Sequence, residues 1–340
     1  MNIFKNEVLT QGAVLTSCLE HYEKGENDTA LDAVFAGVKA GKYTKILLAG
    51  MGSSYYAPLT VSGYLTNNVL PAYVFCADEL AARQMKLVDE KTLVIAVSQS
   101  GESKETVDLA EKSRKITDVV AVVDNTSSSL AKAGTWVLPI YAGIERHISN
   151  KTYQTSLAVL VILARYLAGK RGNEIYADLD GAAKWCSDYL ADLDAHGGEM
   201  FSFVRGAMMF DFFADGAALA TAKQSSLIYR EGPNYYSGCM ECQDYYHGWN
   251  RCADGKYVGI AMIPGFLAGC IADKMISLVV ADGGKCILMT DSDEKPTADG
   301  VLIVKLPKCA DEVFSIISNI PANALMAMML DENPGKPLPH

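Results

Sequence analysis

Short segments that are apolar at nearly every position alternate with helix-length segments along this chain, and this alternation strongly constrains the fold. Strands of that kind are covered on both faces, as in a parallel sheet wrapped by helices. In the first half, the pattern predicts strands at residues 45–49, 72–76, 92–97, 118–123 and 135–140, with helices at 54–65 and 104–115. The first half is therefore expected to form a doubly wound α/β sheet.

The alternation restarts after predicted helices at 153–167 and 173–193, with further strands at 208–213, 257–263, 285–290 and 301–306 and helices at 217–229, 266–281 and 311–330. A chain of 340 residues exceeds what one core usually supports. We expect two α/β domains with doubly wound parallel sheets in tandem, each built of three αβα layers. They are a first domain at 31–194 and a second at 195–340 that includes a C-terminal tail, after an N-terminal helical segment at 1–30. The boundary is placed where residues 195–198 (Ala-His-Gly-Gly) interrupt the pattern.

Charge and composition limit the partners. The formal net charge is −10, so the surface repels nucleic acid and anionic lipid, and neither is an expected partner. The apolar run at 157–163 is far shorter than the roughly 20 residues that span a bilayer, and the N-terminus lacks secretory features. Nine cysteines, an odd number, fit reduced thiols. We expect a cytoplasmic protein without a membrane partner.

Two polar loops follow predicted strands, at residues 50–54 (Gly-Met-Gly-Ser-Ser) and 98–103 (Ser-Gln-Ser-Gly-Glu-Ser). Backbone N–H groups and hydroxyls at the start of a helix bind anions, and neighbouring strand ends of a doubly wound sheet meet at one crevice. The two loops could thus hold one phosphate without a lysine. Taken alone, the first loop is equally well explained as a serine-capped turn. It is not a dinucleotide fingerprint, because Tyr55 replaces the third glycine.

These loops resemble the signature of the sugar isomerase (SIS) domain. The tandem arrangement, over about residues 30–335, is similar to the double-SIS group, which includes the isomerase half of glucosamine-6-phosphate synthase and the ketosamine-6-phosphate deglycases. The resemblance implies flavodoxin-like SIS domains, no cofactor, and a homodimer or larger oligomer with its active site at the subunit interface. It also implies that a sugar phosphate is bound by Gly52, Ser53, Ser54, Ser98, Gln99, Ser100 and Ser103.

The same resemblance assigns roles in the second half. Glu231 precedes His247 by the family's separation of sixteen residues. Glu231 would transfer the proton between C1 and C2 of the sugar through an enediol or enolamine, and a desolvated glutamate suits this because burial raises its pKa. His247, from the neighbouring subunit, would open the ring or protonate the leaving amine. Without the resemblance, a lone Glu and a lone His sixteen residues apart indicate nothing.

Three further residues are candidates for the substrate site. Lys151 lies in a segment similar to the family element that opens a helix near the sugar, although it could equally be a surface charge on a capped helix. Asp244 occupies the place of a family glutamate, and Arg230 precedes the candidate base.

Departures from the family pattern shape the expected activity. Ile228 stands where the isomerases carry a lysine, the chain stops at His340 before the family's tail lysine, and Asn2 replaces the nucleophilic cysteine of a glutaminase half. We expect a deglycase, deaminase or aldose–ketose isomerase that acts on a ketosamine or amino-sugar 6-phosphate, with release of the amine favoured and no glutaminase activity. The alternative is a non-catalytic regulator that binds a phosphosugar. The chain has no basic face or helix-turn-helix, which disfavours a DNA-binding regulator.

Residues 239–252 allow two more interpretations. Cys239, Cys242, His247 and Cys252 could enclose zinc, but buried thiols explain the cysteines more simply, so we predict no metal. The surrounding tyrosines and Trp249 predict a dimer interface, part of which faces the substrate.

Overall fold

The computed structural model describes residues 2–146, 148–333 and 335. The chain divides into two compact units. Unit 1 comprises Met1–Gly12, Arg146–Asn150 and Lys184–His340, and unit 2 comprises Ala13–Glu145 and Lys151–Ala183. Most of the predicted C-terminal tail, at residues 334 and 336–340, lies outside the described residues.

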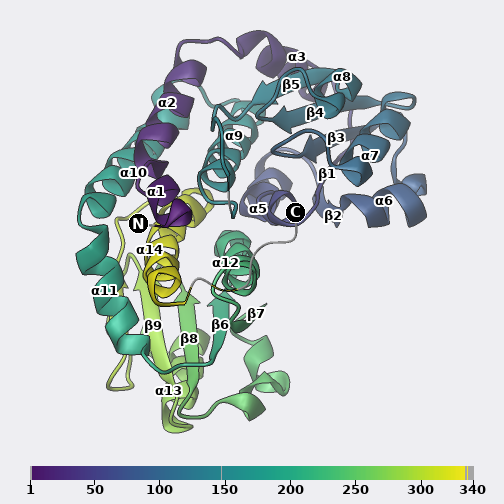
Figure 1. Ribbon diagram of the computed structural model, residues 1–340. Helices are drawn as coiled ribbons and strands as arrows, with labels where there is room; N and C mark the ends of the chain where they lie inside the picture. Colours follow the sequence, from purple (N-terminus) through teal and green to yellow (C-terminus); the bar gives the residue numbers. More distant parts are fainter. Residues whose placement is uncertain (1, 147, 334, 336–340) are drawn as a thin grey trace. The chain divides into compact units, whose positions relative to one another are not determined.

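Unit 2 contains a parallel five-stranded sheet in the order β2-β1-β3-β4-β5 (Figure 1). Its strands are β1 (Lys45–Gly50), β2 (Ala72–Cys76), β3 (Thr92–Val97), β4 (Asp118–Val123) and β5 (Trp136–Pro139). Every residue of β3 is buried, as its continuous apolar sequence predicts for a central strand covered on both faces.

Two groups of helices accompany this sheet. The first group packs on the face that carries Leu47, Val94 and Val119, and the second packs together through α9. The first consists of α6 (Ala77–Arg83), α7 (Lys104–Arg114) and α8 (Ser129–Ala133), and the second of α3 (Asp28–Lys39), α4 (Ser53–Tyr56), α5 (Leu59–Asn68) and α9 (Lys151–Leu167). The remaining helices of the N-terminal part are α2 (Gln11–Glu23) and the short η1 (Met85–Leu87).

Unit 1 repeats the same topology. Its strands are β6 (Met209–Ala214), β7 (Tyr236–Met240), β8 (Tyr257–Met262), β9 (Lys285–Thr290) and β10 (Leu302–Lys305), and they are ordered β10-β9-β8-β6-β7. In each sheet the second strand lies outside the first, and the third lies on the first strand's other side. The prediction of two tandem doubly wound α/β domains is confirmed.

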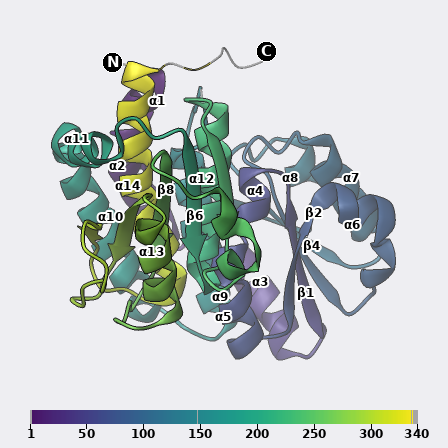
Figure 2. The same ribbon diagram turned by 90° about the horizontal axis from the view of Figure 1, so that it is seen from below.

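The helices of unit 1 come from two separate parts of the chain, its N-terminal segment and the part that begins within α10. They are α1 (Ile3–Val8), part of α10 (Asn173–Ala191), α11 (Leu193–Val204), α12 (Leu219–Glu231), α13 (Ile271–Ala281) and α14 (Asp311–Glu332), with short turns η2 (Gly216–Ala218), η3 (Asp244–His247) and η4 (Trp249–Cys252). Figure 2 shows α1 beside the yellow α14. Lys5 of α1 forms ion pairs with Asp194 at 2.5 Å and Asp331 at 2.9 Å, which attach the N-terminal segment to α11 and α14.

Among the described residues, only α14 has the length and hydropathy of a segment that could cross a membrane. Of that stretch, 94% is buried inside the protein. The helix therefore has the exposure of a core helix, packed against α11 and α12.

Two expectations about local structure are wrong, and one strand was missed. The helix predicted at 54–65 is divided into α4 and α5 at Pro58, whose ring removes a backbone N–H donor. Strand β7 was not predicted, because an edge strand containing Ser237 and Gly238 lacks the apolar continuity of a central strand. Residues 195–198 do not interrupt the helices but lie inside α11.

Gly197 is glycine because α11 and α14 approach closely at this point. A Cβ built on Gly197 would lie 2.8 Å from the backbone oxygen of Ala324, whereas a Cβ on Gly198 meets nothing within 4 Å. Gly197 therefore permits α11 to pack against α14, whereas Gly198 only lowers the helix propensity of α11.

This contrast predicts opposite effects for neighbouring substitutions. Gly197→Ala should lower the free energy of unfolding by about 1–3 kcal/mol, because overpacking outweighs the gain in helix propensity. Gly198→Ala should raise it by about 0.5–1 kcal/mol. Urea unfolding of both variants measures the difference, and a Gly197→Ala protein at least as stable as the wild type would contradict the packing argument.

Candidate functional site

The two serine loops of unit 2 leave neighbouring strands at the same edge of the sheet. Strands β1 and β3 are parallel partners, with Ala49 opposite Ala96. Strand β2 pairs with the other side of β1, so the strand order reverses between β1 and β3. Such a reversal leaves a crevice at the carboxyl ends of the strands, and ligands of open α/β sheets bind there. The structure thus brings the predicted phosphate-binding loops together.

The first loop depends on two glycines. A Cβ on Gly50 would lie 2.3 Å from the backbone oxygen of Ser54, and Gly52 has a left-handed φ of 52°. Ser53 and Ser54 follow at the start of α4 and are half-buried. Among the described residues, their hydroxyls have no hydrogen-bond partner, so both are available to a ligand.

The second loop is held in shape by Ser98. Its buried hydroxyl donates to the Ser103 hydroxyl at 3.2 Å and accepts the N–H of Gly101 at 3.2 Å. The exposed Ser100 hydroxyl accepts the N–H of Glu102 at 3.2 Å. The backbone carbonyl of Gln99 accepts the N–H of Asp124. The side chain of Gln99 is a further polar group of the loop. Ser98 is thus mainly a positioning residue, and Ser100 presents its hydroxyl to solvent.

Glu102, the acidic residue of the second loop, is bonded to the start of α8. Its carboxylate accepts the N–H of Ser129 at 3.0 Å and the Ser129 hydroxyl at 2.8 Å, at the start of α8. These bonds lower the pKa of Glu102. The acidic residue of the motif therefore caps a neighbouring helix.

The equivalent loop of unit 1 is already occupied by the protein's own carboxylates. After β8, the N–H of Gly265 bonds to Asp291 at 2.6 Å, that of Ala268 to Glu294 at 2.6 Å, and that of Gly269 to Asp273 at 2.7 Å. This loop, residues 263–270, also contains no serine or threonine. Of these two equivalent loops, as far as the described residues go, the one in unit 2 carries hydroxyl groups and the one in unit 1 is bonded to carboxylates of the same unit.

Glu231 ends α12 in unit 1 and is half-buried. Burial raises the pKa of its carboxyl group, and no other described residue forms a hydrogen bond or ion pair with it. A desolvated carboxylate without a partner has the properties of a general base.

His247 and Arg230 line one cavity of about 350 Å³, which we call the β7 cavity; the other lining residues are Met209, Asp211, Tyr236, Gly238, Gly248, Trp249 and Cys252. Arg230 donates from Nε to the Ser237 carbonyl at 2.7 Å and lies over the Tyr236 ring at 4.8 Å. Glu231 is not one of these lining residues. The structure therefore groups His247 with Arg230 and does not bring His247 and Glu231 together.

Sequence reasoning missed Asp211, a buried carboxyl group in the β7 cavity. Burial raises its pKa, although it accepts the Tyr257 hydroxyl at 2.8 Å. Asp211 lies in the middle of β6, and the only available signal was an acidic residue inside an otherwise apolar strand. Asp244 orients a ring of the same cavity, since it accepts the indole N–H of Trp249 at 3.1 Å.

Lys151 is the first residue of α9 in unit 2, and this helix contacts α4. The next residue, Thr152, donates its N–H to the Glu145 carboxylate at 3.2 Å. The helix start is thus capped, as expected from its sequence.

The cysteines near His247 are not arranged as metal ligands. The described residues include no group of three His, Cys, Asp or Glu side chains that could hold a metal ion. Burial raises the pKa of Cys239 to about 12, so its thiol stays protonated near neutral pH.

The comparison with known proteins matches the part of the chain that carries the two serine loops. Residues 42–165, most of unit 2, match the family model of the SIS domain. Over these residues the chain is similar to the SIS domain. It is 27% identical over 327 residues to glutamine–fructose-6-phosphate aminotransferase (isomerizing) of Pyrococcus horikoshii, covering 90% of this chain and 54% of that protein. The chain thus spans about half the length of such relatives.

Solved structures share the fold of nearly the whole chain. The C-terminal domain of glucosamine-fructose-6-phosphate aminotransferase from Francisella tularensis has a TM-score of 0.80 at 20% identity, over 96% of this chain and 95% of that one. Glucosamine-6-phosphate deaminase from Thermotoga maritima has a TM-score of 0.75 at 15% identity, over 99% and 97%. At these identities the likeness shows the fold, two α/β units in tandem.

The carboxylates that occupy the unit 1 loop predict a pH effect on stability. Although burial opposes its charge, hydrogen bonds from Thr297 and Gly269 lower the pKa of Asp273 in the folded protein. The stabilisation that the Asp273 carboxylate gives to the folded protein is therefore fully present above the ordinary carboxyl pKa of about 3.9. It is lost as the pH falls through the lower pKa of the folded state.

Asp273→Asn should lower the free energy of unfolding at pH 7 by about 1–3 kcal/mol and flatten its fall in acid. Asp299→Asn, on an exposed side chain of the nearby loop, is the matched control and should change neither. Urea unfolding at several acidic pH values measures both. Equal curves for the two variants would show that Asp273 does not stabilise the loop.

Proposed function

We propose that this protein is an enzyme that releases an amine from a ketosamine or amino-sugar 6-phosphate. The observation that carries the proposal is the hydroxyl-rich crevice between β1 and β3, which contains no anion of its own, whereas the same position in unit 1 is filled by carboxylates. A phosphate supplies the missing anion. The names of the relatives, an aminotransferase and a deaminase of amino-sugar phosphates, support this substrate class.

The phosphate binds to the Ser53 and Ser54 hydroxyls of the first loop and to Ser100 and the Gln99 amide of the second. Neutral donors suffice where the loop that carries them is already held in shape, as Ser98 holds the second loop, since binding then requires less reorganisation. Binding energy from the phosphate then orients the distant reacting carbons.

Glu231 is the proton-transfer base. It removes the proton from C1 of the ketosamine, whose C1–H electron pair forms a C1–C2 double bond as the C2 carbonyl oxygen gains a proton. The resulting enolamine is reprotonated at C2 as the amine N–H proton leaves, which gives an imine at C1 and keeps the hydroxyl group at C2. Water adds to C1, and the C–N bond breaks to give an aldose 6-phosphate and a free amine.

His247 opens the sugar ring or protonates the leaving amine, contributed from the neighbouring subunit of a homodimer. Its position in the β7 cavity, apart from Glu231, is compatible with a role at another subunit's site. The dimer and the cytoplasmic location remain predictions. Gel filtration with multi-angle light scattering tests the dimer.

Replacing the proposed base should abolish turnover and preserve binding. Glu231→Gln should reduce kcat for a fructosamine 6-phosphate by about 10²–10⁴-fold, since general-base catalysis typically contributes that much. Because the pKa of Glu231 is raised, wild-type kcat should fall on the acid side at a pH above the ordinary carboxyl range. Release of glucose 6-phosphate measures both effects.

The exposed Glu241→Gln is the matched control for this experiment and should leave turnover unchanged. Full turnover by Glu231→Gln would exclude Glu231 as the base. Binding of sugar phosphates by the wild type without any turnover would instead favour a phosphosugar-binding regulator.

The phosphate site is tested separately from the base. Ser100→Ala should raise KM about tenfold with a smaller change in kcat, because it removes an exposed hydroxyl and its one bond to the N–H of Glu102, while the bonds of Ser98 that hold the loop remain. Ser202→Ala, on an exposed face of α11, is the control. If Ser100→Ala combined with Ser98→Ala leaves the affinity for hexose 6-phosphates unchanged, the phosphate is bound elsewhere.

A further inference from the structure

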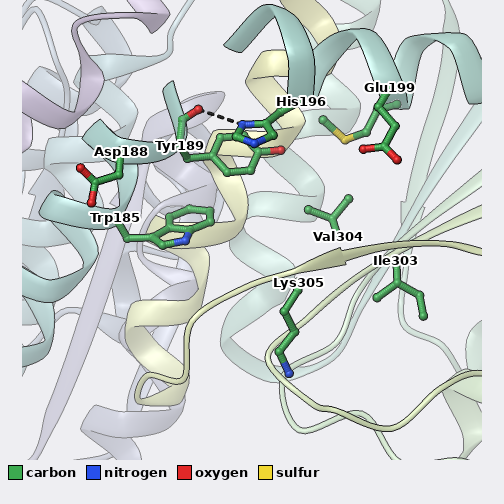
Figure 3. A pocket seen from close by; sticks show the side chains of 9 residues that line it. Trp185, Asp188, Tyr189, His196, Glu199, Ile303, Val304 and Lys305 are labelled. Atoms are coloured by element: carbon green, nitrogen blue, oxygen red, sulfur yellow. Dashed lines mark hydrogen bonds between the residues drawn. The ribbon is translucent and has the colours of Figure 1, made fainter. Parts of the chain in front are cut away.

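A second cavity of unit 1 lies at β10, the opposite edge of the sheet from β7. This β10 cavity has a volume of about 390 Å³. It is lined by Trp185, Asp188, Tyr189, His196, Glu199, Met200, Ile303, Val304 and Lys305 (Figure 3). Four strand spacings, about 19 Å, separate β10 from β7, so the β10 cavity is distinct from the one that contains His247.

Three aromatic rings form one wall of the β10 cavity. The Trp185 and Tyr189 centroids are 4.9 Å apart, and the Tyr189 and His196 rings stack with centroids 4.1 Å apart. Nδ1 of His196 lies 3.0 Å from the Tyr189 carbonyl oxygen, the dashed line in Figure 3. A carbonyl only accepts, so Nδ1 donates, and Nε2 of the neutral ring is left as an acceptor. The wall therefore presents π faces and acceptor groups.

The charges around these rings are unequal. Lys305 forms an ion pair with Asp293 at 2.5 Å and donates a hydrogen bond to the Asp291 carbonyl at 2.8 Å. Its amine points away from the rings in Figure 3. Glu199 has no ion pair or hydrogen bond with any other described residue. Burial and the charge of Glu199 together raise the pKa of the Tyr189 hydroxyl, which indicates that the field of this carboxylate reaches the rings.

We propose that the β10 cavity binds a small organic cation, an ammonium or guanidinium compound, against the faces of Trp185 and Tyr189 and near Glu199. Aromatic faces attract cations, and an unpaired carboxylate adds to that attraction. The volume lies within the 300–1,000 Å³ range usual for small-molecule sites. The net charge of −10 also favours the approach of a cation over that of an anion. A neutral ring would stack on the same wall but would gain nothing from Glu199.

Choline and its neutral isostere 3,3-dimethylbutan-1-ol are the probes that separate these two cases. The chain has three tryptophans, so Trp136→Phe with Trp249→Phe leaves Trp185 as the only one. In this background, choline should change the Trp185 fluorescence saturably. The neutral alcohol should bind at least tenfold more weakly, because it lacks the charge that the rings and Glu199 attract. Circular dichroism checks that the background protein is folded.

Substitutions in the wall assign the binding to its parts. Glu199→Gln should weaken choline binding at least threefold and leave binding of the alcohol unchanged. Tyr189→Leu should weaken choline binding at least tenfold, whereas Tyr189→Phe keeps the π face and should bind as the wild type does. Glu241→Gln is the control for loss of a surface charge and should have no effect.

Three results would overturn the proposal. They are equal affinity for choline and the neutral alcohol, the absence of saturable choline binding at millimolar concentrations, and unchanged choline affinity in both Glu199→Gln and Tyr189→Leu. Because none of these residues belongs to the proposed catalytic machinery, turnover of fructosamine 6-phosphates should be the same in Glu199→Gln and the wild type.

Discussion

The parallel pairing of β1 with β3 is the constraint on which the candidate phosphate site depends. Parallel strands end at the same edge, so the loops that follow them meet there whatever their sequences are. The close approach between residues 50 and 54 then restricts which residues can form the first loop, since a side chain at Gly50 would collide with the backbone of Ser54. Topology thus determines the place of the site, and close packing determines which residues can form it.

Unit 1 shows that the same topology can serve a different purpose. Its loop after β8 binds the carboxylates of Asp291, Glu294 and Asp273, so the backbone donors of this loop stabilise the protein itself. The cavities of unit 1 lie instead at the two sheet edges, β7 and β10, where helices and turns from other parts of the chain contribute aromatic rings.

A protein with a net charge of −10 can offer a phosphate site only if local geometry outweighs the overall field. Here the acidic residue of the second loop, Glu102, is engaged at the start of α8, and the remaining groups of that loop are neutral. Placing hydroxyls at the crevice also keeps the site free of the flexible side chains that a lysine-based site would need.

Much of the architecture was predictable because a strand that is buried on both faces is apolar at nearly every position. The apolar run of β3 predicts a central strand, and glycine beside serine predicts an anion-binding turn. The edge strand β7 was missed, because one side of an edge strand has no strand partner and its composition is less constrained.

The residue types available for chemistry, serines at two strand ends and a glutamate at the end of a helix, were determined by the sequence alone. Which of these residues meet was decided only by the tertiary structure. It groups His247 with Arg230 and Asp211, places Gly197 inside a helix, and joins Trp185 and Tyr189 of α10 to His196 and Glu199 of α11 and to β10. The physical reason is that local sequence specifies backbone preference and burial, whereas the distance between segments far apart in the chain depends on how their side chains pack.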